Sequence, residues 1–403
     1  MARTGARCIS CGTPSVEVLM DLGPQPPSNR FLRPDEASEA RHPLVLGQCQ
    51  ACALLQLIRP MPLEMVKSRF EWLTYNEPEG HLDRLVERLA GLPELNPKAS
   101  ILGITYKDDS TLKRFGGLGF ARTRRLDPAV DLGIEDQRAS LETIQAALTP
   151  ARAEALAERH GRADLVVARH ILEHAHDPSA FLQACARLAR PGGWMVFEMP
   201  DSRKFLDAGD QCFLWEEHIA YFTPSTLRGH CACNGFANPE IIIDPYPLED
   251  SLIGLVRNTR GESSRAAADP EEIARGQRFR ALAQAQRAAW RATLARLGTE
   301  GKRVAVFGAG HLAAKFINFY GVADLIACVI DDNPHKQQLR MPGSGLPIIG
   351  SAALADRAID LCLLSLSPES EQRVLEAKKD FRAGGGEFRS IFALSPIGIR
   401  AAA

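Results

Sequence analysis

The sequence lacks three features that would place the protein in a membrane, outside the cell or on a nucleic acid. No stretch approaches the roughly 20 consecutive apolar residues that a membrane span requires. Residues 1–12, MARTGARCISCG, lack the apolar core of a signal peptide. The 48 Lys and Arg residues balance 49 Asp and Glu residues, so no excess of positive charge attracts nucleic acid or an anionic membrane. We therefore expect a cytoplasmic protein.

The composition is that of a globular chain with several cores. With 403 residues, the chain is long enough for about two to three domains. Its residues are 45% hydrophobic and 24% charged, which excludes a wholly disordered chain. Ten cysteines without an export signal argue against a disulfide framework and for metal ligation or burial. We expect a multidomain enzyme.

Four of the cysteines form two Cys-x2-Cys pairs, Cys8 with Cys11 and Cys49 with Cys52. Each short turn holds two sulfurs on one side, so the two pairs can bind one Zn²⁺ tetrahedrally. Four thiolates leave no open coordination position, and the predicted zinc site is therefore structural. The alternative is four unrelated buried or free cysteines. We assign residues 1–75 to this zinc-binding module.

From residue 100 on, short apolar stretches alternate with helical patterns, which predicts a parallel, doubly wound α/β sheet over residues 76–260. One long helix is expected over about 137–159. A second break near residue 260 precedes an Ala/Arg/Gln-rich helix, for which we expect a solvated linker over 261–298. A second α/β domain follows over 299–403.

Several polar residues stand where the strands of the middle domain are expected to end. Asp127 follows the second strand, where a carboxylate can bind the ribose of a cofactor, although an ordinary turn residue is equally consistent with the pattern. His174 follows the strand within 164–172, while His170 and His176 are expected to be surface or capping residues. Glu217 beside His218 offers a base and a carboxylate that can orient it.

The order of these motifs resembles the sugar C-methyltransferases of deoxysugar pathways, which act on nucleotide-linked 4-keto sugars. The resemblance covers about residues 8–395. The strings that carry it, besides the two cysteine pairs, are PQPPSNRFL (24–32), RHILEHAHDPSAFL (169–182), EEHIAYFTPSTL (216–227) and DDNPHKQQLRMPGSGLPI (331–348).

The resemblance implies an N-terminal zinc-binding module, a central class I methyltransferase-like Rossmann domain and a C-terminal Rossmann-like α/β domain. It also implies S-adenosylmethionine (SAM) as the cofactor. His218 would remove the C3 proton of the sugar, Glu217 would orient His218, and His174 would donate to the enolate oxygen. The cofactor would be lined by Asp127, Asp108 and Thr105. The substrate would be lined by Tyr75, Trp215, Tyr221, Lys315 and His335.

One segment departs from the family pattern. The first turn of such methyltransferases has an acidic residue followed by spaced glycines, because the backbone must approach SAM closely. Here Gly103 stands in the place of the acid, and Thr105 and Asp109 stand in the places of the glycines. Tyr106 or Lys107 could fill part of the cofactor site.

In the C-terminal domain, Gly308-x-Gly310 follows an expected strand and opens a helix, and Asp331 lies about 22 residues farther on. Alone this pattern predicts a bound dinucleotide. The family resemblance implies instead a domain that helps to hold the nucleotide sugar without a redox cofactor. Lys315 and His335 are candidate phosphate neighbours, with surface positions as the alternative.

Three functions remain open from the sequence. The first is a C-methyltransferase of a nucleotide-linked keto sugar. The second keeps the Glu217/His218 base but omits methyl transfer, which would make the protein a SAM-independent epimerase or isomerase. The third is a non-catalytic binding protein. The sequence does not determine the oligomeric state or the identity of the sugar.

Overall fold

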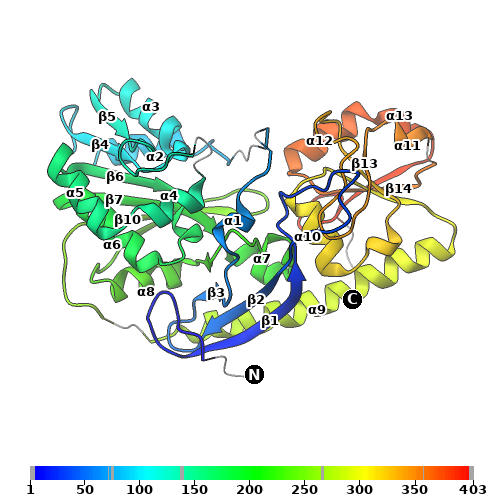
Figure 1. Ribbon diagram of the computed structural model, residues 1–403, viewed down its shortest axis with the longest axis horizontal. Helices are drawn as coiled ribbons and strands as arrows, with labels where there is room; N and C mark the ends of the chain where they lie inside the picture. Colours follow the sequence, from blue (N-terminus) through cyan, green and yellow to red (C-terminus); the bar gives the residue numbers. More distant parts are fainter. Residues whose placement is uncertain are drawn as a thin grey trace.

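A computed structural model describes residues 5–70, 72–73, 77–136, 140–264, 267–356 and 358–398. Three β-sheets organise the chain, and Figure 1 shows the central sheet and the C-terminal domain on opposite sides of the N-terminal strands. Within the described ranges, no helix combines the length and the hydrophobicity that crossing a membrane requires. The sheets and their helices agree with the predicted α/β class.

The N-terminal sheet is antiparallel, with the strand order β1-β2-β3-β8. Its strands are β1 (Val16–Gln25), β2 (His42–Cys49), β3 (Leu55–Leu57) and β8 (Ala220–Tyr221). Strand β8 comes from the segment directly after His218, and it pairs with β3 through Leu55 opposite Tyr221. The zinc module and the candidate catalytic segment therefore share one sheet.

The central sheet has the strand order β5-β4-β6-β7-β10-β9. Its first four strands are parallel, whereas β10 is antiparallel to both of its neighbours. The strands are β4 (Ser100–Gly103), β5 (Arg122–Arg125), β6 (Ala163–Arg169), β7 (Ala189–Asp201), β9 (Glu240–Asp244) and β10 (Asp250–Arg257). Because β4, β6 and β7 are parallel neighbours, their carboxyl ends meet at one edge of the sheet.

Helices cover both faces of the central sheet (Figure 1). The helices of the chain up to residue 233, which include these, are α1 (Leu63–Val66), α2 (Leu82–Ala90), α3 (Asp109–Gly117), α4 (Leu141–Ala147), α5 (Pro150–His160), α6 (Pro178–Leu188), α7 (Arg203–Ala208) and α8 (Pro224–Cys233). Short 3-10 turns are η1 (Tyr106–Asp108), η2 (Leu172–His174) and η3 (Gln211–Phe213).

The single helix expected over 137–159 is two helices. Thr149 caps α5 by accepting a hydrogen bond from the amide of Arg152, and Pro150 occupies the first turn. A proline has no amide hydrogen to continue the preceding helix, so α4 ends before it. Residues 137–139 lie outside the described part of the chain.

The expected linker helix is α9 (Pro270–Thr299), which begins after the N-cap Asp269. It is not merely solvated, because Phe279, Ala283, Trp290 and Leu294 are buried along it. Helix α9 packs on β1, α7 and α10 and so contacts all three domains. In Figure 1 it runs below them from the central domain to the C-terminal domain.

The C-terminal domain has a fully parallel sheet with the strand order β13-β12-β11-β14-β15. Its strands are β11 (Val304–Phe307), β12 (Cys328–Ile330), β13 (Ile348–Ile349), β14 (Leu361–Leu364) and β15 (Glu387–Ser390). Its helices are α10 (His311–Tyr320), η4 (Ala323–Leu325), α11 (Ala353–Asp356), α12 (Pro368–Ala377) and α13 (Lys379–Ala383).

Candidate active site

Two chain segments that are far apart in sequence form the candidate site. The first is η2, which follows β6 and contains Glu173 and His174. The second is Trp215–His218, which precedes β8. The amide of Ile219 donates a 2.7 Å hydrogen bond to the carbonyl of Glu173 and so ties the second segment to the first. This bond brings His174 and His218 together at the carboxyl edge of the central sheet.

The two histidine rings lie edge to face, with their centroids 4.7 Å apart. One ligating atom each from Glu173, His174 and His218 lies within 4.8 Å of the others. His174 Nδ1 also lies 2.9 Å from Glu142 Oε1. Glu142 belongs to α4, and the sequence analysis did not single it out because its contact with His174 depends on the tertiary fold.

The surroundings of the two imidazoles shift their pKa values in opposite directions. Burial lowers the pKa of His218 to about 3, and the positive charge of His174 adds to this effect. Burial also lowers the pKa of His174, but the hydrogen bond and the charge of Glu142 outweigh it and raise that pKa above its ordinary value. At neutral pH, His218 is therefore neutral, whereas Glu142 favours the protonated form of His174.

Glu217 does not contact His218 in the way that the resemblance implies. Its Oε1 accepts a 3.0 Å hydrogen bond from Asn29 Nδ2, which is the one hydrogen bond to this carboxyl found among the described residues. Burial raises the pKa of Glu217 well above its ordinary value, and the charges of Glu142 and Glu216 raise it further. The role of Glu217 in orienting His218 stays a prediction.

Glu216 is a second carboxylate that the sequence analysis missed. It forms a buried ion pair with Lys315 of α10, and it accepts a hydrogen bond from the backbone amide of Ser28. Lys315 is only 2% exposed, and its ammonium group lies over the ring of Phe319. Lys315 is therefore an internal partner of Glu216, and its role as a phosphate neighbour stays a prediction.

Two aromatic contacts involve residues of the predicted substrate site. The Trp215 ring lies 5.0 Å from His218 and 3.8 Å from His311, measured between centroids. His335 stacks on Trp72 at 5.7 Å. Tyr221 is buried in β8, and its hydroxyl donates to the carbonyl of Trp215, so it supports the segment from behind.

Of the residues expected to bind substrate, Tyr75 lies outside the described residues. The others make the contacts described above, and their roles in substrate binding stay predictions. These residues are Trp215, Tyr221, Lys315 and His335.

The loop after β4 is closed by hydrogen bonds from its own backbone to Asp108. Asp108 Oδ2 accepts hydrogen bonds from the amides of both Ile104 and Thr105, each 2.8 Å long. Thr105 caps η1 by accepting from the amide of Lys107. A side chain on Gly103 would bring its Cβ within 2.8 Å of the Asp108 Cβ, so this position cannot carry the acidic residue of the family pattern.

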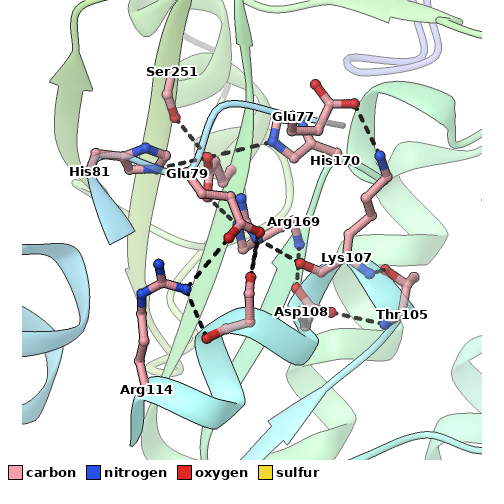
Figure 2. A network of polar contacts seen from close by, with 12 residues as sticks. Glu77, Glu79, His81, Thr105, Lys107, Asp108, Arg114, Arg169, His170 and Ser251 are labelled. Carbon is pink, nitrogen blue, oxygen red and sulfur yellow. Dashed lines mark hydrogen bonds and ion pairs between the residues drawn. The ribbon is translucent and has the colours of Figure 1, made fainter. Parts of the chain in front are cut away.

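The side chains of Lys107 and Tyr106 extend from this loop. Figure 2 shows Lys107 reaching Glu77, where Nζ and Oε1 are 3.1 Å apart. The charges of His170 and Lys107 hold the pKa of Glu77 at about 2, although burial opposes the shift. Tyr106 is 48% exposed, and burial of its hydroxyl raises its pKa to about 12.

A buried ionic network lies beneath the loop (Figure 2). At its centre, the Glu198 carboxylate is 2.6 Å from Arg169 Nε and 2.9 Å from His81 Nε2. Ser251 also donates to Glu198, and Arg169 donates to the carbonyl of Lys107. This network holds the carboxyl ends of β6 and β7 against the loop.

The residues present do not fit SAM at its methionine end. The amides of Ile104 and Thr105 are already bonded to Asp108, and the side chain of Thr105 occupies a position that the family leaves to glycine. The ribose end fits better. Asp127 is exposed after β5, and its Oδ1 accepts from the amides of Ala129 and Val130, so Oδ2 can still accept from ribose hydroxyls.

In the turn after β11, the acidic residue Asp331 is also bonded to other groups of the protein. Asp331 Oδ2 accepts from the amide of Ala309 at 2.9 Å and forms an ion pair with Lys336. Gly308 has a φ of +99°, and a side chain there would meet Leu366 at 2.6 Å. Asp331 therefore stabilises the glycine turn, and it is not free to bind the ribose of a dinucleotide.

The four N-terminal cysteines form a compact cluster whose sulfurs all lie within 4.8 Å of one another. The sulfurs of Cys8 and Cys52 are 3.5 Å apart, and those of Cys11 and Cys49 are 3.7 Å apart. A tetrahedral zinc ion with Zn–S bonds of about 2.3 Å requires sulfurs about 3.8 Å apart. The residues therefore fit a structural zinc ion.

The fold and the site define an α/β methyltransferase-type enzyme joined to a cysteine-rich module. Three family models match consecutive parts of the chain. They describe a zinc binding domain at residues 8–65, a methyltransferase domain at 75–241 and a C-methyltransferase C-terminal domain at 260–393. The chain is similar to C-methyltransferases throughout this domain order, and it is a transferase.

A relative similar over its full length is the C-methyltransferase NovU of Streptomyces niveus. It is 24% identical over 402 residues, which covers 94% of each chain. A shorter match is the ubiquinone biosynthesis O-methyltransferase of Bordetella pertussis, 48% identical over 44 residues. This match covers 11% of this chain and 18% of that protein.

Among solved structures, the 1,6-didemethyltoxoflavin-N1-methyltransferase of Burkholderia thailandensis is 18% identical, with a TM-score of 0.29. The match covers 45% of this chain and 77% of the other. The magnesium protoporphyrin IX methyltransferase of Synechocystis is also 18% identical, with a TM-score of 0.31. That match covers 44% of this chain and 81% of the other.

Proposed function

We propose that this C-methyltransferase acts on a nucleotide-linked keto sugar and that His218 is the base that forms the enolate. The full-length similarity to a C-methyltransferase supports the reaction class. The histidine pair, two rings in contact whose pKa values are shifted in opposite directions, carries the proposal for the mechanism. Pairs of titratable groups whose surroundings push their pKa values apart are typical of acid–base catalysis.

The chemistry of the proposed step is enolate formation. A 4-keto group acidifies the neighbouring C3–H of the sugar. His218 removes this proton through its neutral ring nitrogen, and the C–H electron pair moves into the enolate. His174, whose protonated form is favoured by Glu142, donates a hydrogen bond to the developing oxyanion. The C3 carbon then carries the electron pair that a carbon–carbon bond requires.

SAM, when bound, would supply the electrophilic methyl group for that carbon. The steps that this chain's own residues perform end with the enolate, because the loop from Gly103 to Asp109 does not fit the methionine end of SAM. The closed loop favours a second candidate function. Deprotonation by His218 followed by return of the proton would make the protein an epimerase or isomerase that needs no methyl donor.

The experiment offers the protein a dTDP-linked 4-keto-6-deoxyhexose in deuterated water, with and without SAM. Both candidate functions predict exchange of the C3 proton for deuterium. A methylated sugar that forms only with SAM supports the first, whereas exchange or epimerisation together with no SAM binding at millimolar concentration in calorimetry supports the second. Absence of exchange with every keto sugar nucleotide offered would contradict the base assignment.

A further inference from the structure

Asn29 lies in the PPSN string of the zinc module, to which the proposed reaction assigns no role. Its side chain is 3% exposed, and both hydrogens of its amide nitrogen are used. Nδ2 donates to the carbonyl of Val66 at 2.9 Å and to Glu217 Oε1 at 3.0 Å. A flipped amide would turn its oxygen toward two other oxygens, so the contacts fix the orientation of Asn29.

Ser28, which precedes Asn29, makes similar contacts with Glu216, which precedes Glu217. The amide of Ser28 donates to Glu216, and the hydroxyl of Ser28 lies 3.4 Å from the other oxygen of the same carboxylate. Lys315 of the C-terminal domain pairs with Glu216 from another side. Two consecutive residues of the zinc module therefore hold two consecutive residues of the catalytic segment.

The Glu217 carboxyl group that Asn29 contacts lies near Glu142 and His174. One carboxyl oxygen of Glu217 lies within 4.8 Å of ligating atoms of both Glu142 and His174. Three buried carboxyl groups (Glu142, Glu216 and Glu217) crowd this region, and like charges repel one another. The hydrogen bond from Asn29 fixes the position of the Glu217 carboxyl group among them.

We propose that Asn29 is a positioning residue of the zinc module, which holds the carboxyl group of Glu217 beside Glu142 and His174. The contact of Ser28 and Lys315 with Glu216 fixes the backbone beside it. This inference rests on the proposed function, because it assigns Asn29 a part in proton transfer. It gives the zinc module a direct contribution to the geometry of the site.

The test compares Asn29→Ala with Asn234→Ala. Asn234 is a matched control because its amide also donates two hydrogen bonds, to Ser179 and to the carbonyl of His230, both outside the histidine pair. With the dTDP-linked 4-keto-6-deoxyhexose, we expect Asn29→Ala to lower kcat for deuterium exchange about tenfold or more, with KM within about twofold. Asn234→Ala should leave both values unchanged.

A second measurement needs no substrate. The carboxyl group of Glu217, carbon-13 labelled, is titrated by NMR in the ligand-free protein. Loss of the hydrogen bond from Asn29 to the ionised form should raise the pKa of Glu217, whereas Asn234→Ala should not change it. The charged groups whose fields act on Glu217, namely Glu142, Glu216, Lys315 and Lys107, are the same in both variants.

The outcomes separate this proposal from the proposed function. If wild-type protein never exchanges a substrate proton, the function is wrong, and the Glu217 titration alone decides the role of Asn29. An unchanged titration together with unchanged exchange in Asn29→Ala overturns the positioning role, as do equal losses in both variants. Should Asn29→Ala fail to fold, Asn29→Asp keeps the size of the side chain, removes the donor and should give a larger drop in kcat.

Discussion

At the scale of single residues, the proposed chemistry depends on two neighbouring histidines whose pKa values are shifted in opposite directions. Glu142 makes this difference, because its carboxylate stabilises the protonated form of His174 while the burial of His218 has no such compensation. Sequence patterns could locate His174 and His218, since both follow recognisable strand ends. They could not locate Glu142, Asn29 or Glu216, whose contacts join residues between 32 and 188 positions apart.

We predict that His218→Asn lowers the rate of deuterium exchange by about a hundredfold to ten-thousandfold and leaves the fold intact. Asparagine keeps the polarity and much of the size of the side chain but cannot accept a proton at neutral pH. His160→Asn is the control, because His160 contacts Asp131 instead of the histidine pair. Unchanged exchange together with a lower melting temperature in His218→Asn would show that His218 is a structural residue.

A pH profile tests the role of Glu142. If His174 acts in its protonated form, exchange falls as the pH rises through the pKa of His174. Glu142→Gln removes the charge that raises this pKa, so the alkaline limb of the profile should move to lower pH. The same variant should also lose the stability that protonated His174 contributes below its folded-state pKa. An alkaline limb that does not move would mean that a group other than His174 limits the reaction.

At the scale of secondary-structure elements, the alternation of strands and helices was predictable because it depends on local periodicity. The break between α4 and α5 was missed although Pro150 marks it. The burial of α9 was also missed, because its Ala/Arg/Gln composition suggests a solvated helix and its apolar residues gain their partners only in the tertiary fold. Strand β8 consists of two residues, and its pairing with β3 depends on a sheet assembled from distant segments.

The β4–α3 loop gives a prediction at this scale. Gly103→Ala should lower the free energy of unfolding by about 1–3 kcal/mol, because its Cβ would approach Asp108 Cβ to 2.8 Å and Leu112 Cδ1 to 3.0 Å. Gly116→Ala in α3 is the control, since a Cβ there meets open space and alanine favours a helix. Denaturant unfolding compares the two variants. Equal effects would mean that the loop is not packed as tightly as described.

At the scale of the whole molecule, the site lies where the three domains meet. The zinc module supplies Ser28 and Asn29, the central domain supplies the histidine pair, and the C-terminal domain supplies Lys315. The zinc module also takes β8 into its own sheet. The module is therefore not the distant structural element that its cysteine pattern alone suggests, and changes at the zinc site should affect the chemistry.

Zinc removal tests this coupling. We expect about one zinc ion per chain, bound by Cys8, Cys11, Cys49 and Cys52, and its absence from freshly prepared, unchelated protein would contradict the site.

Cys49→Ser should lower the melting temperature, because a structural zinc ion contributes its binding free energy to folding. It should also reduce deuterium exchange below the unfolding transition, since β3 and β8 are joined by Leu55 and Tyr221 next to His218. Cys233→Ser, outside the cluster, is the control. Destabilisation with full exchange activity would mean that the zinc module does not set the geometry of the site.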